Sequence, residues 1–88
     1  MNNDFEKGNI LEFDRIGTTI VLGNIEYDSS LYALVCPFRN NKDGKIKADL
    51  KELILLKNEK NDVQAVTNYN IISNVVPQIL KKENINLE

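Results

Sequence analysis

The segment from Leu31 to Phe38 is the most hydrophobic stretch of this chain, and it limits the folds that the chain can adopt. Successive side chains of a strand point to opposite faces, and here both faces would be hydrophobic. One face carries Leu31, Ala33 and Val35, and the other carries Tyr32, Leu34, Cys36 and Phe38. Such a strand is typical of the middle of a sheet with cover on both sides. Pro37 cannot donate to a strand ladder, so pairing should stop or bulge near it.

A second pattern, close to the C-terminus, predicts an amphipathic helix. Hydrophobic residues recur there at spacings of one, three and four, which places them on one stripe of a helix: Ile71, Ile72, Val75, Val76, Ile79 and Leu80. We expect Asn70 to cap its start, and Lys81 and Lys82 to favour the negative end of the helix dipole. Pro77 either kinks this helix, or the regular helix starts near Ser73 and holds Pro77 in its first turn.

The other segments alternate short strand patterns with polar turns. Strands are predicted over residues 10–14, 17–27 and 63–67, and over residues 50–57 after a tight turn at Asp43-Gly44. The segment 50–57 also has leucines and charges that favour a helix, but its short length after a hairpin signal favours a strand. Gly23-Asn24 predicts a bulge or a tight turn inside the second strand, and Asp28-Ser29-Ser30 predicts the turn that follows it.

These elements predict an α+β fold, a small antiparallel β-meander of four to five strands with one C-terminal amphipathic helix packed on one face. The 88 residues are enough for one domain. We expect that domain over residues 9–83, with a flexible N-terminal tail over residues 1–8 and a C-terminal tail over residues 84–88.

The composition predicts a soluble protein of the reducing cytoplasm. The longest uninterrupted apolar run, from Leu31 to Cys36, is far shorter than the ~20 residues that span a bilayer. Residues 1–8 carry three charges and lack the apolar stretch of a signal peptide. The single cysteine cannot form an internal disulfide and fits a reducing compartment.

The residues available for chemistry argue against an enzyme. The chain has no histidine, which is the commonest general base and the commonest metal ligand. Cys36 has no imidazole to activate it, and in apolar surroundings a thiol stays protonated and inert. The carboxylate pairs Glu12 with Asp14 and Glu26 with Asp28 alternate along strands, a spacing typical of solvated surface. We therefore predict no catalytic residues and no cofactor.

One segment resembles the middle of a calcium-binding EF-hand loop, Asn41-x-Asp43-Gly44-x-Ile46. An EF-hand needs Asp at the first position of the loop and Glu at the twelfth, and here those positions hold Arg39 and Leu50. The positive charge of Arg39 repels calcium, and Leu50 cannot serve as the bidentate ligand. The four glycines also fit no phosphate-binding loop, so no metal or nucleotide site is predicted.

The charges are distributed unevenly along the chain. Residues 1–38 carry two basic and six acidic side chains, whereas residues 39–60 carry seven basic and four acidic ones. The basic segment offers a nucleic-acid contact through phosphates, with Tyr32 and Phe38 near enough in sequence to stack on bases. Its residues are Arg39, Lys42, Lys45, Lys47 and Lys51. The pI of about 5.1 favours a simpler interpretation, in which the lysines keep a hairpin soluble and block edge-to-edge pairing.

The run from Asn24 to Pro37 resembles the YrzB-like family of small, uncharacterised bacterial cytoplasmic proteins. The resemblance lies in a short strand, a turn, and then an aromatic residue followed by small and aliphatic residues that end near a proline. Segments 53–56, 63–66 and 71–80 follow in the matching order, so it covers about residues 10–82. The family is usually acidic after the proline, and this chain is basic there. The resemblance implies a small single domain with no established activity and no catalytic residues.

One helix is too small to cover both faces of the strand over residues 31–38. The uncovered face should then be exposed or should bind another chain, because a contiguous apolar patch usually marks an interaction site. We therefore expect a protein–protein interaction or regulatory module, with a homodimer as its simplest form and no membrane partner. The expected anchors are Tyr32, Leu34 and Phe38, since aromatic side chains are favoured in interfaces.

Overall fold

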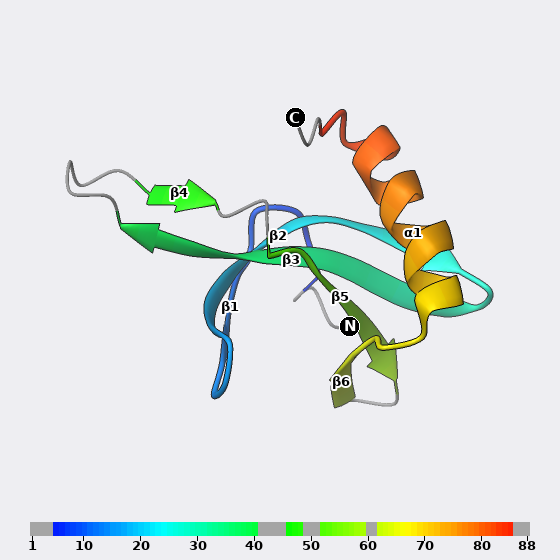
Figure 1. The fold of residues 1–88 in the computed structure, drawn as a ribbon, viewed down its shortest axis with the longest axis horizontal. Helices are drawn as coiled ribbons and strands as arrows, with labels where there is room; N and C mark the ends of the chain where they lie inside the picture. Colours follow the sequence, from blue (N-terminus) through cyan, green and yellow to red (C-terminus); the bar gives the residue numbers. More distant parts are fainter. Residues whose placement is uncertain (1–4, 41–45, 49–51, 60–61, 86–88) are drawn as a thin grey trace.

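The computed structural model describes residues 5–40, 46–48, 52–59 and 62–85, and among these it leaves out the side chains of residues 38–40, 46–48 and 59. Six strands precede one helix in these residues (Figure 1). The elements are β1 (Ile10–Phe13), β2 (Gly17–Tyr27), β3 (Ser30–Asn40), β4 (Ile46–Ala48), β5 (Ile54–Glu59), β6 (Asp62–Ala65) and α1 (Tyr69–Lys82).

The sheet is an antiparallel meander. Its strands lie in the order β1-β2-β3-β5-β6, and the short strand β4 pairs with the far end of β3. The hydrophobic strand β3 is therefore central, between β2 on one side and β5 on the other. The predicted α+β fold, with a meander and one C-terminal helix, is confirmed. Segment 54–59 is a strand rather than a helix, while β4 was not predicted. The predicted Asp43-Gly44 turn lies outside the described residues.

Two local features, a tight turn and a β-bulge, shape the long hairpin of β2 and β3. Asp28 and Ser29 have φ values of 50° and 66°, which is the left-handed pair that a two-residue type I′ turn requires. This turn brings Tyr27 opposite Ser30 and fixes the register of the hairpin. The register then shifts between Val21 and Gly23, so the predicted bulge is present.

Helix α1 begins at Tyr69, and its N-cap is Asn68 rather than the predicted Asn70. The Oδ1 atom of Asn68 accepts from the backbone N–H groups of Asn70 (2.9 Å) and Ile71 (3.4 Å). Both asparagines suit a cap, and the one that precedes the first helical turn takes that role. Because the helix starts at Tyr69, Pro77 lies in its interior and not in its first turn. The basic pair Lys81 and Lys82 occupies the last turn as predicted.

The core consists of two clusters on opposite faces of the sheet. The helix-side cluster lies between the sheet and α1 and contains Tyr32, Leu34, Leu55, Val75 and Ile79. The far-side cluster lies on the other face and contains Phe5, Val21, Ala33, Val35 and Leu56. Half-buried side chains of β1, Leu11 and Phe13, pack against the far-side cluster. Strand β3 therefore contributes to both clusters, as its alternating pattern predicted.

The N-terminal segment corrects the predicted tail over residues 1–8, because from Phe5 onward it lies against the sheet. Phe5 is only 4% exposed and belongs to the far-side cluster. The backbone N–H of Gly8 donates to the Val21 carbonyl oxygen (2.8 Å), and the N–H of Val21 donates to the Asn9 carbonyl oxygen (2.9 Å). Residues 5–9 thus extend the domain by one anchored turn before β1.

Candidate interaction surface

Two of the three predicted anchor residues lie in the interior of the domain. Tyr32 is 3% exposed and Leu34 is completely buried, both in the helix-side cluster. The ring of Tyr32 meets that of Tyr27 edge to face, with 6.3 Å between the ring centroids. The third, Phe38, belongs to β3, and its side chain lies outside the described part of the structure. Tyr32 and Leu34 cannot contact a partner in the folded domain, so their prediction as anchors is wrong.

The reason is that the chain covers both faces of β3 itself. From Tyr32 to Cys36 no residue is more than 3% exposed. Helix α1 covers one face, and Phe5 together with strand β1 covers the other. Strand β1 stays in place partly because the hydroxyl of Thr19, a buried residue, donates to the Leu11 carbonyl oxygen (2.9 Å). The predicted shortage of cover therefore does not arise over these residues.

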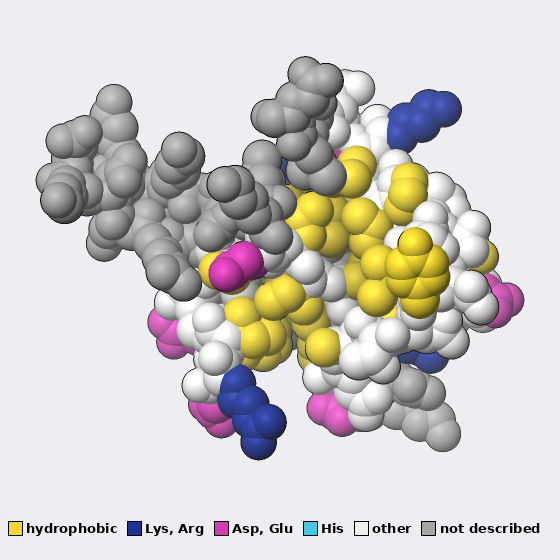
Figure 2. All heavy atoms as spheres, in the orientation of Figure 1, with side chains coloured by type: hydrophobic (Ala, Val, Ile, Leu, Met, Phe, Trp, Pro, Cys, Tyr) yellow, Lys and Arg dark blue, Asp and Glu magenta, His cyan; other side chains and the backbone are white. Residues whose placement is uncertain are grey.

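Helix α1 is the element that keeps an incompletely covered hydrophobic side. Val75 and Ile79 face the sheet and are completely buried. Four further apolar side chains are only half-buried at the edge of the helix-side cluster, Ile71, Ile72, Val76 and Leu80. The first residue of the helix, Tyr69, is 78% exposed. Tyr69, Ile72, Val76 and Leu80 are spaced by three, four and four residues, so they lie along one line of the helix. We call these four residues the outer stripe of α1, and Figure 2 shows hydrophobic side chains gathered over α1 and beside it.

The sequence segment that contains the outer stripe carries no charge. No charged residue occurs between Asp62 and Lys81, although 27% of the chain is charged. The exposed residues of α1 beside the stripe include Ser73 and Pro77, and Asn74 lies on the opposite side of the helix. An ordinary surface helix carries charged residues on its outer face. The cores of protein–protein interfaces, in contrast, are depleted in charge and enriched in tyrosine.

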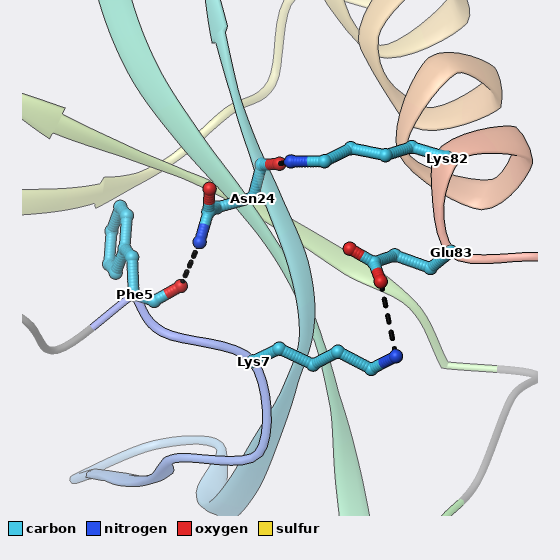
Figure 3. A network of polar contacts seen from close by, with 5 residues as sticks. All are labelled: Phe5, Lys7, Asn24, Lys82 and Glu83. Atoms are coloured by element: carbon cyan, nitrogen blue, oxygen red, sulfur yellow. Dashed lines mark hydrogen bonds and ion pairs between the residues drawn. The ribbon is translucent and has the colours of Figure 1, made fainter.

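The C-terminal end of α1 is fixed to the sheet by close packing and polar contacts (Figure 3). The Nζ of Lys82 donates to the Asn24 carbonyl oxygen (2.9 Å), and Glu83 pairs with Lys7 at 3.1 Å. The helix also approaches Gly23 closely, since a Cβ at that position would lie 2.7 Å from Cγ of Glu83. These contacts hold α1 at one angle on the sheet and so present its outer stripe in a defined orientation.

The described residues form no cluster of side chains that could hold a metal ion. Within ranges 5–40, 46–48, 52–59 and 62–85, no three His, Cys, Asp or Glu residues come together as metal ligands could. The predicted surface carboxylates Glu12, Asp14, Glu26 and Asp28 are all exposed. Cys36 is completely buried. In the part of the chain that the structure describes, no helix has both the length and the hydropathy to cross a membrane.

The basic residues proposed for phosphate contact are only partly placed. Arg39 and Lys47 are partners in the antiparallel pairing of β3 with β4, which extends away from the rest of the sheet (Figure 1). Their side chains are not described. Lys42, Lys45 and Lys51 lie outside the described residues. The structure therefore does not test the nucleic-acid prediction, although it places Arg39 opposite Lys47.

Comparisons with protein-family models, with curated proteins and with solved structures found no match to this chain.

Sequence reasoning missed two residues that matter for the surface. Tyr69 stood outside the aliphatic periodicity that defined the helix, but the absence of charge from residues 63–80 could have marked it. Phe5 stood alone in a polar segment, and one aromatic residue has no periodicity. Nothing local in the sequence specifies that Phe5 packs against β2, β3 and β5.

Proposed function

We propose that this chain is a non-catalytic protein–protein interaction module of the cytoplasm, and that the outer stripe of α1 is its docking surface. The observation that carries the proposal is a helix with Tyr69 78% exposed in a stretch of 18 residues without a charge. Exposed tyrosine contributes strongly to interfaces because it buries a large area with little loss of side-chain entropy. Packing of the C-terminal end of α1 on Gly23 and Asn24 holds the helix on the sheet.

A second copy of the chain is the simplest partner. An isologous interface places the same patch of each copy face to face, and an uncharged patch can do so without repulsion between identical side chains. Antiparallel packing of two α1 helices would set Tyr69 of one copy near Leu80 of the other. The helix dipoles would then oppose each other, which is favourable. The four residues of the stripe bury a small area, so we expect a weak dimer in rapid exchange.

The experiment is sedimentation equilibrium of the full chain from micromolar to millimolar concentration. We compare the wild type with Tyr69→Lys, which places a charge in the stripe, and with Asn74→Lys, which adds the same charge to the opposite side of the helix. We expect Tyr69→Lys to weaken self-association by about tenfold or more. We expect Asn74→Lys to leave it unchanged.

A wild-type chain that stays monomeric at millimolar concentration would overturn the homodimer. The same three proteins then serve as baits in the native lysate. A partner that uses the outer stripe is retained by the wild type and by Asn74→Lys but not by Tyr69→Lys. Equal retention by all three baits would exclude the stripe as the docking surface.

The alternative function is nucleic-acid binding through Arg39, Lys42, Lys45, Lys47 and Lys51. It is favoured by one observation, the direct pairing of Arg39 with Lys47 on the β3–β4 extension, because opposed like charges are destabilising unless an anion offsets them. This function predicts binding to a single-stranded oligonucleotide that weakens steeply as salt rises. Fluorescence anisotropy at low salt tests it, with Arg39→Glu and Lys47→Glu expected to abolish binding. Absence of binding by the wild type at low salt would exclude it.

A further inference from the structure

Residues Phe5 to Asn9, which we call the N-terminal strap, are held on the far face of the sheet in the way that a short peptide is held. The aromatic side chain of Phe5 packs with Val21, Ala33, Val35 and Leu56, each no more than 2% exposed. We call this set of four residues the Phe5 site. It lies on the opposite face of the sheet from α1, so it is separate from the outer stripe.

Three kinds of contact hold the strap on the domain. Its side-chain anchor is Phe5. Its backbone is held by Asn24, whose side-chain amide donates to the Phe5 carbonyl oxygen (2.6 Å; Figure 3). Val21 adds two backbone hydrogen bonds, one with Gly8 and one with Asn9. The positive charge of Lys7 in the strap is paired with Glu83 at 3.1 Å. Peptide-binding surfaces use the same combination of a pocketed anchor, main-chain hydrogen bonds and a charge.

Three consecutive residues of the strap are open to solvent. Glu6, Lys7 and Gly8 are exposed, and the strap turns back on itself through the N–H of Asn9, which donates to the Glu6 carbonyl oxygen (3.0 Å). Gly8 has a φ of 92°, in the left-handed region, with no atom within 4 Å of the position that a Cβ would take. A segment anchored by one buried side chain beside such a glycine opens more readily than a strand in the middle of a sheet.

The far face also carries a buried hydrogen-bond acceptor that has no partner among the described residues. The Oδ1 atom of Asn58 is buried and has no hydrogen-bond partner in the described structure. Asn58 follows Leu56 on the same face of β5 and pairs with Leu31, which packs against the far-side cluster. This acceptor is available to a backbone N–H of a bound segment that reaches Asn58. Buried polar atoms without a partner are uncommon and often mark a missing contact.

We propose that the Phe5 site is a peptide-recognition site that the strap occupies in cis. It accepts segments of other proteins in which an aromatic residue is followed two positions later by Lys or Arg, as Phe5 is followed by Lys7. The strap competes with such a segment at a high effective concentration because it is part of the same chain. The domain therefore binds its partner weakly until the strap is displaced. This inference does not depend on the outer stripe of α1.

The test uses the full chain and a fluorescent peptide with the sequence of residues 1–9. Phe5→Ala empties the Phe5 site, so that chain should bind the peptide at least about tenfold more tightly than the wild type does, by fluorescence anisotropy. A peptide with Phe5→Ala should not bind. Adding Glu83→Gln to the Phe5→Ala chain should weaken binding of the wild-type peptide, because Lys7 loses its partner. Equal binding of the two peptides, or no gain over the wild-type chain, would overturn the proposal.

A second measurement decides the matter if the Phe5→Ala chain does not fold. Native-state hydrogen exchange of the wild type reports whether the strap opens by itself. The amide of Gly8, which is bonded to Val21, should exchange through a local opening, whereas amides of the buried segment of β3 should exchange only on global unfolding. If the Gly8 amide exchanges only with the global transition, the strap is not a detachable element and the site is not available to a partner.

Discussion

A single residue, Phe5, largely decides whether the far face of the sheet is covered. It is 4% exposed and packs with four side chains from β2, β3 and β5. We expect Phe5→Ala to destabilise the domain by about 3–5 kcal/mol, because the substitution removes a buried aromatic ring and leaves a cavity. Urea denaturation of the full chain measures this loss.

The control for that substitution is Phe5→Leu, which keeps most of the apolar volume and should lose less stability than Phe5→Ala. A Phe5→Ala chain within about 0.5 kcal/mol of the wild type would behave like a typical surface variant. Such a result would restore the interpretation of residues 5–8 as a tail.

Gly23 is the second position at which one residue sets the packing of a whole element. A Cβ there would lie 2.7 Å from Cγ of Glu83 and 3.0 Å from Cγ2 of Ile79, so these side chains or the helix that carries Ile79 would have to shift. We expect Gly23→Ala to destabilise the domain by about 1–3 kcal/mol through overpacking. The double variant Gly23→Ala with Glu83→Ala should recover part of that loss, because the nearest clashing atoms are gone. Denaturation of all four proteins gives the coupling energy, and strictly additive losses would exclude the crowding between Gly23 and Glu83.

Pro77 is the main irregularity of α1 at the element scale. It lies inside the helix and is exposed, so its ring contributes little packing, while it removes one helical N–H and crowds the carbonyl of Ser73. We expect Pro77→Ala to stabilise the domain by about 1–3 kcal/mol, less than the full propensity difference because proline also restricts the unfolded chain. Thermal denaturation measures it, with Ser73→Ala as a control for an alanine elsewhere on the exposed side. A loss of stability in Pro77→Ala would mean that proline at this position stabilises the domain.

The elements of this fold differ in how far local sequence specifies them. The aliphatic periodicity of residues 71–80, the two-residue turn at Asp28 and Ser29, and the alternation in β3 are local, and each was interpreted correctly. The N-cap was misplaced because two asparagines stand within three residues of each other. The wrong prediction with the largest consequence was that Tyr32 and Leu34 are anchors of the candidate interaction surface. Burial of Tyr32 and Leu34 depends on which face of the sheet α1 covers, and its buried residues Val75 and Ile79 lie roughly 40 positions away in sequence.

At the scale of the whole molecule, the two core clusters share one strand. Alternate residues of β3 point into the helix-side cluster and the far-side cluster, so displacement of β3 from either cluster disturbs the other. A chain of 88 residues buries only about 60–65% of its unfolded surface, and neither half has enough core to be stable alone. We therefore expect one cooperative unfolding transition for the helix and the sheet together.

Two leucines on opposite faces of the sheet provide a matched test of this shared core. Leu34, which is completely buried, lies in the helix-side cluster, and Leu56, which is 2% exposed, lies in the far-side cluster. We expect Leu34→Ala and Leu56→Ala each to destabilise the domain by about 2–5 kcal/mol, since both delete the same apolar group from a closed core. In each variant the loss of helical circular dichroism should coincide with the change in tyrosine fluorescence, because Tyr27 and Tyr32 report on the sheet beneath α1. A Leu56→Ala variant that costs little, or that leaves the two signals separated, would mean that the far face is open in solution. The face opposite α1 would then be the docking surface.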